Sequence, residues 1–118
     1  MMMVTPFKND PFSVVAKAYS NLYDKPYEAW YGQHKDEKEG KHENEYGYTS
    51  FPFDGGIPEV VIYTEHNINI QVETLAHELA HVAVGVEHEH DEVWEEAFGK
   101  IFDEYNRIFD EMFGGDGE

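Results

Sequence analysis

Apolar residues recur every three or four positions in two long segments, the pattern of helices that bury one face. The first segment predicts a helix from about Ile70 to Val84, with Gly85 as its C-terminal stop. The second begins after Asp91, a favourable N-cap, and its apolar positions repeat up to Gly114 and Gly115. This last helix carries the strongest periodic signal in the chain.

The N-terminal third of the sequence predicts one more helix and a short helical stretch. Asp10 and Pro11 favour a helix start, as N-cap and first helical residue. Apolar spacing then continues to Tyr23, and Pro26 disfavours helix in the residue before it. We expect the short second stretch to cover Tyr27–Gln33.

Two strands are expected in the middle of the chain. Aromatic and small or polar residues alternate from Tyr46 to Phe53, and the segment Glu59 to Thr64 is β-branched, as in a largely buried strand. The charged segment 33–45 contains no residue able to anchor it in a core, so it is predicted as a mobile loop with His34 and His42 solvated.

A chain of 118 residues is long enough for one hydrophobic core, so a single domain over 1–118 is expected, with 114–118 as a flexible tail. No apolar run is long enough to cross a bilayer, and the first residues do not have the pattern of a secretory signal. A cytoplasmic protein without membrane association is therefore the expectation.

Composition limits the chemistry. Because the chain has no cysteine, any metal must be held by its seven histidines or its 25 aspartate and glutamate side chains. The net charge is −17 and only eight residues are Lys or Arg, so nucleic-acid binding is not expected.

The candidate chemistry lies in His77-Glu78-Leu79-Ala80-His81, on the predicted helix that starts near Ile70. Residues four apart on a helix are neighbours on one face, so His77 and His81 can bind the same zinc ion. Glu78 is rotated by roughly 100° from His77, which places its carboxylate to take a proton from water rather than to bind the metal. The motif predicts a zinc-dependent hydrolase.

A catalytic zinc ion usually has three protein ligands and one open position. The segment after Gly85 offers His88 and His90, and His90 is favoured because it precedes the last helix beside Trp94. His88 remains the main alternative, followed by the glutamates of the last helix, Glu95 and Glu96.

The motif, Gly85 and the segment His90-Asp91-Glu92-Val93-Trp94 together resemble the SprT-like and WLM group of zinc metalloproteases. The resemblance covers about Ile57 to Phe102. It implies His77, His81 and His90 as zinc ligands and Glu78 as general base. The chain departs from the group in having no C-terminal zinc ribbon or basic DNA-binding region, so a DNA-linked role is not implied.

The expected fold is a minimal α+β zincin-like domain, in which a sheet of about three strands packs against the motif helix and the first and last helices complete the core. In such folds the substrate lies along the edge strand, and Glu59 to Thr64 is the candidate. The predicted function is a zinc endopeptidase acting on peptide or protein substrates. The alternatives are a metal-binding but inactive interaction domain, or a helical protein with a coincidental motif. The sequence leaves the substrate and the oligomeric state open.

Overall fold

The computed structural model describes residues 2–3, 11–34 and 45–111. In it, four strands form a mixed sheet in the order β1-β2-β4-β3. The strands are β1 (Met2–Met3), β2 (Glu28–Gly32), β3 (Gly47–Ser50) and β4 (Glu59–Tyr63). β4 pairs in parallel with β2 and antiparallel with β3. Together with three helices this makes the chain an α+β protein, as predicted.

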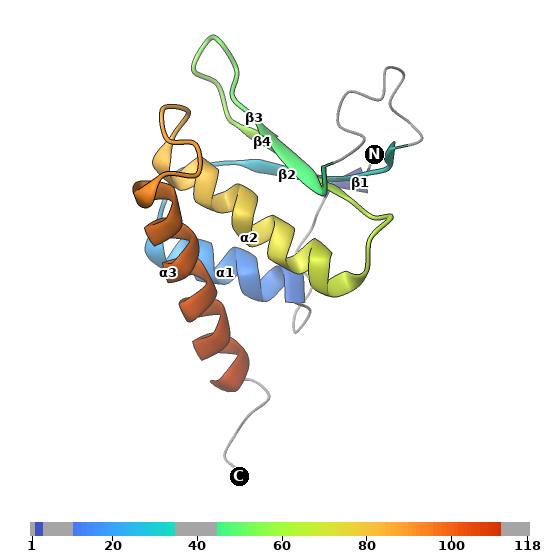
Figure 1. The fold of residues 1–118 in the computed structure, drawn as a ribbon, viewed down its shortest axis with the longest axis vertical. Coiled ribbons are helices and arrows are strands. Elements are labelled where there is room, and N and C mark those ends of the chain that lie inside the picture. The colour runs from blue at the N-terminus through green and yellow to red at the C-terminus, as the bar shows by residue number, and fades with distance from the viewer. Residues whose placement is uncertain (1, 4–10, 35–44, 112–118) are drawn as a thin grey trace.

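The helices α1 (Pro11–Leu22), α2 (Ile68–Val84) and α3 (Glu92–Phe109) all lie on one side of the sheet (Figure 1). The core forms between this helical layer and the sheet. Its most deeply buried members include Ile62 of β4, Leu79 of α2 and Ile101 of α3. No helix in the described part of the chain is long and apolar enough to cross a membrane.

Capping residues fix both ends of the segment that carries the motif. Asn67 caps α2, its side chain accepting a hydrogen bond from the N–H group of Ile70 at 3.0 Å. Gly85 ends α2 with a φ of 93°, a backbone conformation that favours glycine. Asp91 caps α3 by accepting a hydrogen bond from the N–H group of Trp94 at 3.0 Å. The predictions for Gly85 and Asp91 are confirmed.

The predicted helical stretch over Tyr27–Gln33 is wrong, because residues 28–32 form strand β2. They pair with β4 in parallel register, from Glu28 opposite Glu59 to Gly32 opposite Tyr63. This pairing supplies backbone hydrogen-bond partners that come from about 30 positions away along the chain. Helical spacing of a few aromatic residues does not outweigh such long-range pairing.

The prediction that Glu59 to Thr64 is the edge strand is also wrong. β4 lies between β2 and β3, and its residues from Val60 to Tyr63 are all buried. A continuous apolar run is typical of such a central strand. The edge strands are β1 and β3, and Thr49 of β3 hydrogen-bonds to Glu78 of the motif.

The charged segment predicted as a mobile loop falls mainly on residues 35–44, which lie outside the described residues, as does His42. The same holds for the predicted tail at 114–118 and for the helix N-cap at Asp10. His34, however, is not a solvated side chain: its ring stacks on that of Tyr63, with centroids 3.8 Å apart. The last helix ends at Phe109, before the predicted Gly114.

Candidate metal centre

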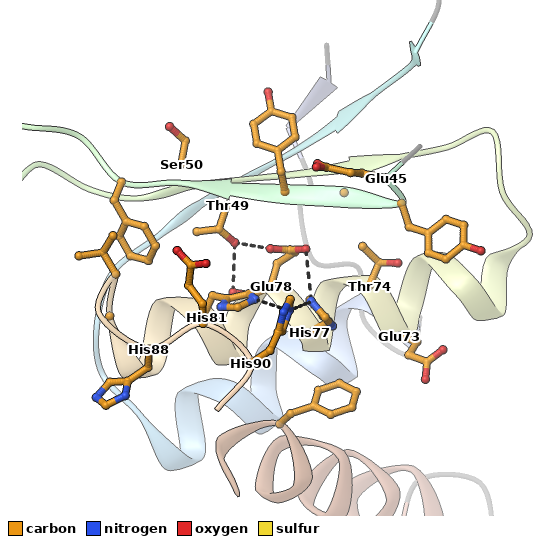
Figure 2. A pocket seen from close by; sticks show the side chains of 18 of the residues that line it. Glu45, Thr49, Ser50, Glu73, Thr74, His77, Glu78, His81, His88 and His90 are labelled. Carbon is orange, nitrogen blue, oxygen red and sulfur yellow. Dashed lines mark hydrogen bonds and ion pairs between the residues drawn. The ribbon is translucent and has the colours of Figure 1, made fainter. Parts of the chain in front are cut away.

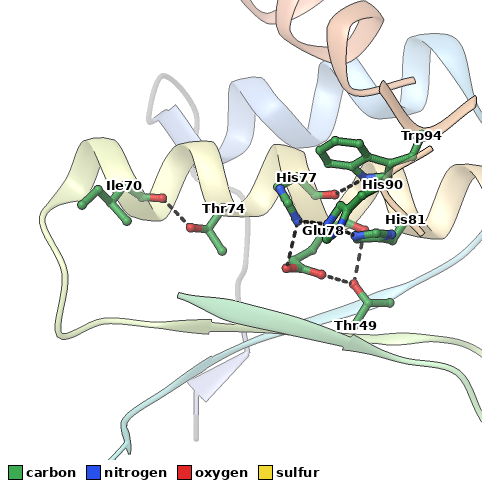
Figure 3. Close-up of polar contacts among 8 residues, drawn as sticks. All are labelled: Thr49, Ile70, Thr74, His77, Glu78, His81, His90 and Trp94. Carbon is green, nitrogen blue, oxygen red and sulfur yellow. Dashed lines mark hydrogen bonds and ion pairs between the residues drawn. The ribbon is translucent and has the colours of Figure 1, made fainter. Parts of the chain in front are cut away.

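Three imidazole rings converge where α2 faces the link between α2 and α3 (Figure 3). His77 and His81 come from successive turns of α2, and His90 comes from the link. The His90 Nε2 atom lies 3.0 Å from the Nε2 atom of His77 and 3.2 Å from that of His81. The three side chains are therefore close enough together to hold one metal ion.

The spacing of these nitrogens fits a tetrahedral metal site. Zinc–nitrogen bonds of 2.0–2.1 Å at the tetrahedral angle place ligand nitrogens about 3.3 Å apart. Since His90 Nε2 is near two other Nε2 atoms at once, a single shared proton satisfies only one of the two contacts. A cation among the three nitrogens would satisfy all of them.

Burial keeps two of these rings in the neutral form that binds metals. It lowers the pKa of His77 to about 4, with further contributions from the neighbouring His81 and His90. The pKa of His81 is lowered for the same reasons, burial first and His90 second. Their lone pairs are thus available to a metal at neutral pH without the loss of a proton.

Of the two predicted third ligands, His90 lies in the cluster and His88 does not. The Nδ1 atom of His88 lies 2.8 Å from Oδ2 of Asp91, and Figure 2 shows its ring turned away from the other histidines. Among the described residues the group of metal-ligating side chains contains the three histidines alone, without Glu95 or Glu96.

Trp94 supports the cluster from the first turn of α3. Its ring centroid lies 4.7 Å from those of His77 and His90 and 5.4 Å from that of His81. The indole N–H group also donates a hydrogen bond to the His77 carbonyl oxygen at 3.3 Å. Trp94 is only 8% exposed, so the rings rest against a fixed core side chain.

His90 has a φ of 54°, in the left-handed region that non-glycine residues rarely adopt. Such a conformation costs about 1 kcal/mol or more and persists only where the surroundings hold it. Here Trp94 packs on the ring, and the next residue, Asp91, is held as the N-cap of α3. The strained residue is the one that brings its imidazole back to α2.

Glu78 lies beside the cluster but outside it. Its Oε2 atom is 4.0 Å from the Nε2 atom of His77, and its other oxygen accepts a hydrogen bond from the hydroxyl group of Thr49 at 2.6 Å. Burial of the carboxyl group raises its pKa to about 7, with the Thr49 hydrogen bond acting in the opposite direction and the nearby Glu45 in the same one. A carboxyl group with a pKa near neutrality can both accept and release a proton.

Thr49 is the site residue that sequence reasoning missed. It lies on β3, 29 positions before Glu78 in the chain, and no local motif marks it. Alternation along the strand places Gly47 and Thr49 on the face toward α2, opposite Tyr48 and Ser50. That alternation was the available signal.

The cluster opens into a cleft of about 1110 Å³ between β3 and α2 (Figure 2). One wall comes from β3 and its flanks, from Glu45 to Phe51, and the other from α2, the link and Phe98 of α3. His77, Glu78, His81 and His90 all line this cleft. A bound molecule could therefore reach the histidines and the Glu78 carboxylate together.

No protein-family model, no curated protein and no solved structure matches the chain. The assignment of a function rests on the residues and geometry of the cleft.

Proposed function

We propose that the protein is a zinc-dependent peptidase, in which His77, His81 and His90 hold the metal and Glu78 is the general base. The position of the Glu78 carboxylate carries the proposal: it is buried, hydrogen-bonded, 4.0 Å from a ligand nitrogen, and faces the cleft. A structural zinc site is closed by four protein ligands, whereas this cluster offers three among the described residues.

Bound zinc would supply a Lewis acid, which polarises a carbonyl group and makes water easier to deprotonate. The chain's own contribution is the movement of one proton. Glu78 accepts the proton from the attacking water and passes it to the amine that leaves when the peptide bond breaks. Thr49 holds one oxygen of the carboxylate, so the other is directed at the reacting groups.

The substrate would bind as an extended strand along β3. The side of β3 away from β4 pairs with no other strand of the described sheet, and β3 forms one wall of the cleft. An extended peptide can use the backbone groups of such an edge while its side chains occupy the cleft. This role for β3 replaces the one expected for β4.

A zincin-like fold and kinship with the SprT-like and WLM metalloproteases belong to the same proposal. They are supported by the motif helix, the third histidine before a tryptophan, and the strand alongside α2. The scarcity of Lys and Arg gives no support to a role on nucleic acid.

The metal site is tested by the zinc content of purified protein and of two matched variants. Wild type should hold about one zinc ion per chain. His90→Ala should lower the zinc affinity by more than about 100-fold, since even outer partners of metal ligands contribute 10- to 100-fold. His88→Ala, in the same link but outside the cluster, should keep the affinity within about threefold. Equal losses in both variants would contradict the assignment of His90.

Peptidase activity is tested by digesting a denatured protein mixture with zinc-loaded wild type and with Glu78→Gln, and identifying new peptide termini by mass spectrometry. Wild type should produce them, and Glu78→Gln should be slower by at least about 100-fold, the usual contribution of a positioned base. A zinc-loaded wild type no more active than Glu78→Gln would leave the protein a metal-binding domain without catalysis.

A further inference from the structure

The cleft is strongly acidic. Four glutamates line it, Glu45, Glu73, Glu78 and Glu89, and the lining side chains in the described part of the chain include neither lysine nor arginine. Three ionised carboxylates carry more charge than the two positive charges of a divalent metal ion, so the cleft stays negative when the metal is bound. The net charge of −17 for the whole chain strengthens the same field.

Two of the four glutamates lie at one end of the cleft. Glu45 precedes β3 and Glu73 lies one turn before His77 on α2, and Figure 2 shows both on the same side of the histidine cluster. Both residues are exposed. Ser50 and His88 lie on the opposite side of the cluster, and Glu89 follows His88 in the link, close enough to His81 to raise the pKa of that ring.

The opposite end of the cleft leads to a largely apolar surface. A second hollow of about 320 Å³ adjoins it, since the two share Phe51, Gly85 and Val86 in their linings. Ile57 and Val82 add further apolar surface to this hollow, and Lys25 is the one charged residue of its lining in the described part of the chain. An apolar hollow therefore adjoins the cleft on the side away from Glu45 and Glu73.

We propose that the cleft selects a cationic peptide segment, with lysine or arginine side chains at Glu45 and Glu73 and a large apolar side chain in the hollow by Phe51 and Val86. The inference rests on the proposed function, because it places the segment along β3 across the histidine cluster. Glu45 and Glu73 are the specificity-determining residues. An anionic segment meets carboxylates on both walls and is rejected.

The test measures binding to zinc-loaded Glu78→Gln, so that it does not depend on catalysis. Three fluorescent octapeptides share a leucine–phenylalanine pair and carry two residues that are lysine, glutamine or glutamate. The lysine peptide should bind at least about tenfold more tightly than the glutamate peptide, equivalent to about 1.4 kcal/mol, with the glutamine peptide between them. Raising the salt concentration should reduce the difference.

Two further variants show where the preference originates. Adding Glu45→Gln and Glu73→Gln should bring the lysine and glutamate peptides to within about threefold of each other. Adding instead Asp103→Asn and Asp110→Asn, which remove the same charge from α3 and its C-cap outside the cleft lining, should leave the preference intact. Equal affinities for the three peptides, or an equal loss in both pairs, would overturn the proposal.

The result is separable from the proposed function. A protein that cleaves peptides without regard to charge refutes the cationic preference and leaves the peptidase standing. A protein that binds the lysine peptide selectively but cleaves nothing refutes the peptidase and leaves the acidic cleft as a binding site.

Discussion

The hydroxyl group of Thr49 ties the edge strand to the proposed general base. It donates to the Glu78 side chain at 2.6 Å and lies 3.3 Å from the Glu78 carbonyl oxygen, so both the carboxylate and its helix turn are held against β3. A base held in one rotamer does not have to be ordered during the reaction. Thr49 is thus a positioning residue for Glu78.

Replacing Thr49 by valine, which has nearly the same shape without the hydroxyl group, should lower kcat about tenfold. One lost hydrogen bond to a charged group corresponds to a free energy of about 1.5–3 kcal/mol, of which part appears in the transition state. The zinc content should stay near its wild-type value, because the hydrogen bonds of the Thr49 hydroxyl group go to Glu78 and not to a histidine of the cluster.

Thr49→Ser is the control, since it keeps the hydroxyl group and should recover most of the lost activity. A general loosening of the strand would impair the serine variant as well. Equal kcat values for the valine and serine variants would therefore argue against a positioning role.

At the scale of elements, the sequence predicts what short-range patterns determine. The 3.6-residue spacing of apolar positions predicts α1, α2 and α3, and Gly85 and Asp91 mark the boundaries between the last two. The histidine pair of α2 follows from the same spacing. His90 could be preferred over His88 because only His90 is placed beside Trp94 at the start of α3.

Strand order could not be predicted in this way. β2 takes its conformation from a partner about 30 positions away, and the position of β4 at the centre of the sheet depends on β2. The contact between Thr49 and Glu78 could not be predicted for the same reason, because it joins residues 29 positions apart in the chain. The part of the candidate site formed by the α2 histidines and Glu78 is local in sequence. The wall formed by β3 is not.

Gly47 allows β3 to approach α2 closely enough for that contact. A Cβ atom at this position would lie 2.5 Å from the carbonyl oxygen of Val61 and 2.7 Å from Cγ2 of Thr74. The neighbouring backbone atom cannot move without disturbing the pairing of β3 with β4. We therefore expect Gly47→Ala to lower the free energy of unfolding by about 1–3 kcal/mol, the usual cost of overpacking.

Gly99→Ala, measured beside it in urea, is the matched control. Gly99 lies within α3 with open space around its missing side chain. Alanine there should increase the free energy of unfolding by about 0.5–1 kcal/mol through higher helix propensity. Equal stabilities for the two variants would contradict the close approach of β3 and α2.

For the whole molecule, two buried groups of the site make stability depend on pH in opposite directions. The pKa of Glu78 is about 7 in the folded protein against an ordinary 4.5, so the unfolded chain loses this proton first and stability falls as the pH rises from 4.5 to 7. The pKa of His77 is about 4 against 6.5, so its contribution makes stability rise over pH 4 to 6.5.

Glu78→Gln removes only the first of these effects. With a metal chelator present, wild type should therefore lose stability relative to the variant as the pH rises from 4.5 to 7. The difference in unfolding free energy, variant minus wild type, should increase over this range. The increase should approach about 3 kcal/mol, at about 1.4 kcal/mol per unit of pKa difference. Urea unfolding at pH 5 and pH 8 measures it, with Glu73→Gln, an exposed carboxyl on the same helix, as control. A difference that is the same at both pH values would contradict the burial of Glu78.

The contact of Trp94 with all three histidine rings gives the protein an optical reporter. A buried indole with its centroid 4.7–5.4 Å from three imidazoles will change its emission when those rings are protonated or bind a metal. The chain has one other tryptophan, Trp30 on β2, and its replacement by phenylalanine isolates the signal. Occupancy of the centre can thus be followed in real time, without labels and without a substrate.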